Sequence, residues 1–101
     1  MKAQFIERIL RESTTGSIFG LLKSHGWSKP HIDRGNTYTL TKSSRGAAWT
    51  ISLLLSSKNV MAECRVTSPK GVSEPFYVNF SDYPDAELFV QEIEQRLNTI
   101  S

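Results

Sequence analysis

Apolar and polar side chains alternate through four consecutive stretches in the middle of the chain. These stretches cover residues 37–41, 48–56, 60–68 and 74–80. A period of two residues is typical of β-strands that bury one face, so the pattern predicts four strands. The connecting segments are short and polar, which favours antiparallel pairing of each strand with the next in a meander.

Apolar residues at helical spacing lie on both sides of these stretches. Before them, residues 3–12 carry one apolar stripe, and residues 18–22 resume the same spacing. Gly16 lies between the two, and Gly26 is placed to end the second with a left-handed turn. The pattern leaves two alternatives open for residues 3–25: one longer helix, or two short helices that meet near Gly16.

A third helical pattern follows the last predicted strand. Ser81 or Asp82 is expected to cap this C-terminal helix, and Pro84 suits its first turn, where a missing N–H costs nothing. Its apolar positions form a single stripe: Ala86, Phe89, Val90, Ile93, Leu97 and Ile100.

This order of elements predicts an α+β fold in one domain spanning residues 1–101. We expect a four-stranded antiparallel β-meander, with the N-terminal helix or helix pair and the C-terminal helix packed on one face. Both helix stripes need an apolar partner, and the apolar faces of the strands are the only large one available. No apolar run approaches the ~20 residues that span a bilayer, and the charged N-terminus is unlike a signal peptide. We therefore expect a cytoplasmic protein that does not bind membranes.

The second face of the sheet is then predicted to be open to water. Threonine and serine dominate the positions of that parity, but Leu54, Met61, Arg65 and Tyr77 also belong to it. Apolar, aromatic and arginine side chains are enriched where proteins bind one another. The sequence therefore favours a non-enzymatic module that docks onto another protein as a regulator, inhibitor or immunity-type protein, as a monomer or homodimer.

The charge distribution supports an alternative partner, a nucleic acid. The net charge is +2, yet residues 23–72 hold eight cationic and two acidic residues, whereas residues 73–101 hold one cationic and six acidic residues. Lys42, Arg45 and Lys70 fall in two loops expected at the same end of the sheet, among serines and glycines, and would form an anion or phosphate patch. In the nucleic-acid alternative, these cations and Arg65 would contact phosphates, and Tyr77 would stack on a base.

Residues with catalytic or metal-binding chemistry are sparse. The chain has one cysteine, Cys64, predicted to be buried, and neither a nucleophile elbow nor a phosphate-binding glycine loop. We predict no catalytic site, metal or cofactor, and expect Glu92 and Glu94 to be solvated charges. One enzymatic alternative, a small ribonuclease, would use this set of residues: His31, Asp33, Arg34 and Lys58.

Overall fold

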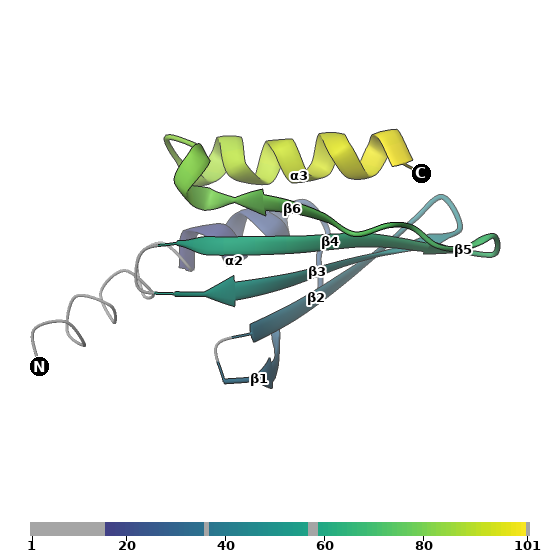
Figure 1. Cartoon of the computed structure of the whole chain (residues 1–101), viewed down its shortest axis with the longest axis horizontal. Helices are drawn as coiled ribbons and strands as arrows, with labels where there is room; N and C mark the ends of the chain where they lie inside the picture. The colour runs from purple at the N-terminus through teal and green to yellow at the C-terminus, as the bar shows by residue number, and fades with distance from the viewer. Residues whose placement is uncertain (1–15, 36, 57–58, 101) are drawn as a thin grey trace, which may run out of the picture.

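One antiparallel sheet with helices against one face makes up the described part of the protein. The computed structural model describes residues 16–35, 37–56 and 59–100. Its elements, in chain order, are α2 (Gly16–Ser24), β1 (His31–Arg34), β2 (Thr37–Ser44), β3 (Ala47–Leu55), β4 (Val60–Ser68), β5 (Gly71–Val72), β6 (Phe76–Asn79), a 3-10 turn η2 (Phe80–Asp82) and α3 (Ala86–Ile100). Figure 1 shows α3 running along the sheet beside β6 and β4.

Every strand pairs antiparallel with its neighbours, and the strand order follows the chain from β1 to β5. Two strands, β5 and β6, pair with the same edge of β4. β5 pairs with the end of β4 at Thr67 and Ser68, and β6 pairs with β4 between Met61 and Cys64. The predicted α+β class and the predicted meander of successive antiparallel strands are therefore confirmed.

Side-chain burial follows residue parity through the central strands. In β3, residues at odd positions from Ala47 to Leu55 are buried, and those between them are half-buried or exposed. The buried strand positions join Ile18 and Leu22 of α2 and Phe89 of α3 in one core cluster. Since fully burying one such side chain contributes about 1.5–3 kcal/mol, this two-layer core is the main source of stability.

The prediction of only four strands was wrong. β1 lies before the first predicted strand, and β5 lies between the third and the fourth, where the pattern predicts no strand. Both strands are short and lack apolar alternation, so the sequence carries no periodic signal for them. In addition, β2 continues to Ser44, three residues beyond its predicted end at Thr41.

The end of α2 agrees with the prediction, whereas the start of α3 differs from it. Gly26 has a φ of 95° and follows α2 in the expected left-handed turn. Asp85, not Ser81 or Asp82, caps α3, because its carboxylate accepts a hydrogen bond from the Leu88 amide at 2.9 Å. The predicted helix at residues 3–12, and with it the choice between one helix and two, lies outside the described residues.

Candidate docking surface on the open sheet face

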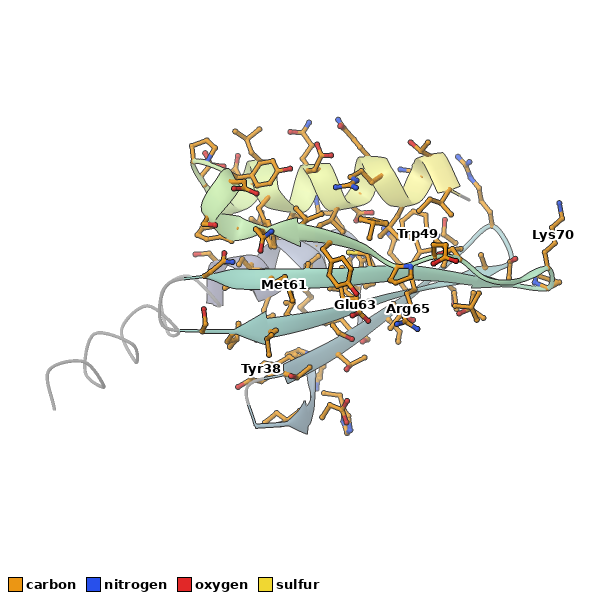
Figure 2. The ribbon with its side chains drawn as sticks, in the orientation of Figure 1. Tyr38, Trp49, Met61, Glu63, Arg65 and Lys70 are labelled. Atoms are coloured by element: carbon orange, nitrogen blue, oxygen red, sulfur yellow. The ribbon has the colours of Figure 1, made fainter. Side chains whose placement is uncertain are left out.

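The face of the sheet turned away from the helices carries short rows of side chains set by strand register. Leu54 of β3 lies opposite Met61 of β4, which lies opposite Asn79 of β6. In the next row, Ser52 lies opposite Glu63, which lies opposite Tyr77. Side chains directly opposite one another, or diagonal, are close enough to touch. Figure 2 shows Met61, Glu63 and Arg65 in succession along β4.

Apolar side chains lie together on this face, toward the end where β3 connects to β4. The exposed fractions of Leu54 and Tyr77 are 44% and 48%, and half-buried Met61 lies opposite Leu54 and diagonal to Tyr77. No element in the described part of the chain covers them. We call the group Leu54, Met61, Glu63, Arg65 and Tyr77 the docking surface.

Polar contacts hold the charged edge of the docking surface. The Arg65 guanidinium lies 3.1 Å from the Glu63 carboxylate, and Tyr77 lies directly opposite Glu63 on β6. Hydrogen bonding to Glu63 and the negative charge of its carboxylate raise the pKa of Tyr77 above its ordinary value. The ion pair with Glu63 limits the entropy that the Arg65 side chain would lose on binding.

Lys42 lies apart from the predicted anion patch, on the helix-covered side. Because β2 extends to Ser44, Lys42 shares the parity of Leu40 and points toward α3. Its ammonium donates hydrogen bonds to the Glu94 carboxylate at 3.1 and 3.4 Å, and the Trp27 indole N–H donates to the same carboxylate at 3.1 Å. The His25 imidazole lies 3.6 Å away. Glu94 is buried, so the expectation that it is a solvated charge was wrong.

Arg45 and Lys70 lie at the same end of the sheet, where two hairpins turn. Both line a pocket of about 460 Å³. Figure 2 shows Lys70 at the tip of the β4–β5 hairpin, far from Met61. Of the three cations predicted to form the anion or phosphate patch, Arg45 and Lys70 line this pocket and Lys42 does not.

The ribonuclease set is only partly described. His31 and Asp33 are exposed on β1, and the side chains of Arg34 and Lys58 lie outside the described residues. Among the described residues, no group of three metal-ligating side chains lies close enough to hold a metal ion. None of the described helices has the length and apolar character needed to cross a membrane.

Cys64 lies in the core beneath the docking surface, as predicted. Burial raises the pKa of its thiol from 9.0 to about 12; the charge of Arg96 opposes this shift and that of Glu63 adds to it. The thiol therefore stays protonated, and unreactive as a nucleophile, at neutral pH.

The raised pKa of Cys64 makes stability fall at alkaline pH. Between pH 9 and pH 12 the unfolded chain loses the thiol proton while the folded chain keeps it, so the free energy of unfolding decreases as pH rises. The expected slope from this group is up to about 1.4 kcal/mol per pH unit. Urea unfolding from pH 8 to pH 10.5 measures it. Cys64→Val should show a shallower decline than the wild type, and equal slopes would contradict this cause.

Comparison with protein-family models, curated proteins and solved structures gave no match to this chain.

Proposed function

We propose that this chain is a non-enzymatic binding module that docks onto another protein through the docking surface. The observation that carries the proposal is the contiguity of Leu54, Met61 and Tyr77 on an uncovered sheet face. Scattered exposed apolar side chains are ordinary on protein surfaces, whereas adjoining ones bordered by polar groups are typical of interaction sites. A regulator, inhibitor or immunity-type protein would act in this way.

The contacts of Arg65 indicate the chemistry of the partner. Its guanidinium has five N–H donors, the described contact is the one to Glu63, and its side chain remains 46% exposed. The remaining donors can serve a partner carboxylate or backbone carbonyl. The complementary protein surface would have an apolar centre over Leu54 and Tyr77 and a hydrogen-bond acceptor at its border.

The ion pairs favour a protein partner over a nucleic acid. Of the four cations that the nucleic-acid alternative requires, Lys42 is paired with Glu94 and Arg65 with Glu63. Each would have to leave its carboxylate, or bring that negative charge with it, to contact a phosphate. Tyr77 also lies opposite Glu63, and a negative charge beside the ring disfavours stacking next to a nucleic-acid backbone.

An affinity capture with matched leucine variants tests the proposal. Leu54 and Leu88 have nearly equal exposed fractions, 44% and 43%, but Leu88 lies on α3, on the other side of the sheet. We expect the wild type and Leu88→Asp to retain the same partner from a lysate of the source cells after nuclease treatment. Leu54→Asp should lose it, because a carboxylate in the apolar centre would have to be desolvated on binding.

Two outcomes would contradict the proposal. One is capture of the same proteins by wild type and Leu54→Asp in equal amounts. The other is the loss of all captured material on nuclease treatment, which would instead support the nucleic-acid alternative. Circular dichroism of both variants confirms that any loss of binding does not follow from unfolding.

A further inference from the structure

A cavity of about 460 Å³ lies between the β2–β3 turn, the β4–β5 turn and the end of α3. We call it the hairpin pocket. In the first turn, Ser44 pairs with Ala47, so Arg45 and Gly46 alone make the connection. In the second, Ser68 pairs with Gly71 around a two-residue turn. Both turns lie at the same end of the sheet because β3 runs antiparallel to β2 and to β4. The volume falls within the range of about 300–1,000 Å³ that small-molecule pockets occupy.

The lining of the hairpin pocket combines apolar walls with two cations. Buried Val66 contributes to the inner wall, and Val72 and Ile100, which are 60% and 44% exposed, contribute to the rim. Arg45 and Lys70 are its only charged lining residues, and neither has an ion-pair partner among the described residues. A ligand that fits this lining has an apolar part and a negative charge.

Backbone and hydroxyl groups add specific hydrogen-bonding capacity. The Ser68 hydroxyl oxygen accepts a hydrogen bond from the Lys70 amide at 3.2 Å, which leaves the hydroxyl proton available for a ligand acceptor. The Ser73 hydroxyl accepts from the Val66 amide at 2.9 Å and keeps the strand after the turn against β4. These contacts hold the pocket wall in place without using the charged side chains of Arg45 and Lys70.

The turn that carries Arg45 has an unusual backbone conformation. The φ of Arg45 is 53° and that of Gly46 is 80°, a pair of values that two-residue hairpins usually obtain with Asn-Gly or Gly-Gly. A long side chain at such a position is unfavourable for the turn itself, and outliers of this kind cluster at ligand-binding sites.

We propose that the hairpin pocket binds a small organic anion, in which a phosphate or carboxylate group is attached to an apolar part. The anionic group lies between Arg45 and Lys70 and accepts from the Ser68 hydroxyl. The apolar part lies against Val66, Val72 and Ile100. The site is independent of the docking surface: it is on the helix-covered side, at the far end of the sheet from Leu54.

Titration of the isotope-labelled full chain, followed by amide chemical shifts, tests this site. The probes are phenyl phosphate and benzoate, with inorganic phosphate and phenol as their separate parts. We expect either or both of the two-part probes to shift the amides of Gly46, Ser68 and Gly71. The dissociation constant of the tighter one should be at least about tenfold below those of inorganic phosphate and phenol. Comparison of the two probes shows which anionic group the site prefers.

Charge variants separate binding from a purely structural role. Arg45→Gln and Lys70→Gln should each weaken binding of the preferred probe by about tenfold, because each removes a charge-assisted contact. Lys29→Gln, a change at an exposed cation away from the pocket, should leave it unchanged. If the two cations only complement the negative end of α3, the melting temperature will fall in these variants and the dissociation constants will not change.

The site is overturned if neither two-part probe shifts these amides, if inorganic phosphate alone binds as tightly, or if the Arg45→Gln and Lys70→Gln variants keep wild-type affinity. The Leu54→Asp variant should retain binding, so failure of the docking proposal and failure of this one are distinguishable.

Discussion

A Leu53→Asp variant should fail to fold, whereas Leu54→Asp, one residue further along β3, should fold with nearly wild-type stability. Leu53 is fully buried and Leu54 is 44% exposed, although both lie in one uninterrupted apolar run. A carboxylate at position 53 would lose its hydration without a partner in the core, at a cost comparable to the whole 5–15 kcal/mol by which small domains are typically stable. At position 54 it would remain hydrated, and we expect a change within about 1 kcal/mol.

Urea unfolding monitored by circular dichroism and tryptophan fluorescence measures this difference. Trp27 and Trp49 are both buried, so their emission reports the core. Equal destabilisation by the two substitutions, or a folded Leu53→Asp protein, would contradict the placement of the helices on the face that carries Leu53.

Replacement of Glu94 should have the second largest effect. Glu94→Leu leaves the Lys42 ammonium without its carboxylate and the Trp27 indole N–H without its acceptor. Breaking a buried ion pair costs about 3–5 kcal/mol, and because Lys42 keeps 20% of its side-chain surface in water, we expect about 2–3 kcal/mol here. The paired change Lys42→Met with Glu94→Leu should recover a substantial part of that loss, since no charge is then left unpaired.

Glu92 provides the matched control on the same helix. Its carboxylate lies 3.9 Å from the Arg96 guanidinium, and the Glu92 and Arg96 side chains are 34% and 44% exposed, so Glu92→Leu should change the free energy of unfolding by less than about 1 kcal/mol. A double-mutant cycle from urea unfolding curves gives the coupling between Lys42 and Glu94. A coupling near zero, or equal effects of the Glu92 and Glu94 substitutions, would show that the buried contacts do not stabilise the fold.

The contacts of Glu94 connect three elements that are distant in sequence. Trp27 follows α2, Lys42 lies on β2, and Glu94 lies in the middle of α3. Lys42 also lies near both indole rings, 5.1 Å from the Trp49 ring centre and 5.9 Å from that of Trp27. This polar cluster lies on the helix-covered side of the sheet, opposite the docking surface.

Residue parity was sufficient to predict the main strands and their buried face. Trp49, Ile51 and Leu53 alternate with polar residues strongly enough that only one arrangement buries them. The same parity places Leu54, Met61, Arg65 and Tyr77 on the uncovered face. That these four residues bind a partner is a separate proposal, which the affinity capture above tests.

The remaining features depend on long-range contacts that leave weak local signals. β1 has four residues, preceded by Pro30, and pairs only with the start of β2. Glu94 lies beside Ile93 on the buried side of α3, and Lys42 continues the parity of Leu40. These positions could have indicated a buried ion pair, but a lysine in a predicted loop and a glutamate on a predicted surface helix are more simply explained as solvated groups.

Site-specific photo-crosslinking at the docking surface tests the central proposal most directly. Tyr77→p-benzoylphenylalanine places the reactive group in the middle of the open face, and the same substitution at Leu88 serves as the control on α3. In a nuclease-treated lysate of the source cells, position 77 is predicted to form a discrete protein adduct that position 88 does not form. The absence of a protein adduct at position 77, or identical adducts at both positions, would contradict the assignment of this sheet face as a protein-binding surface.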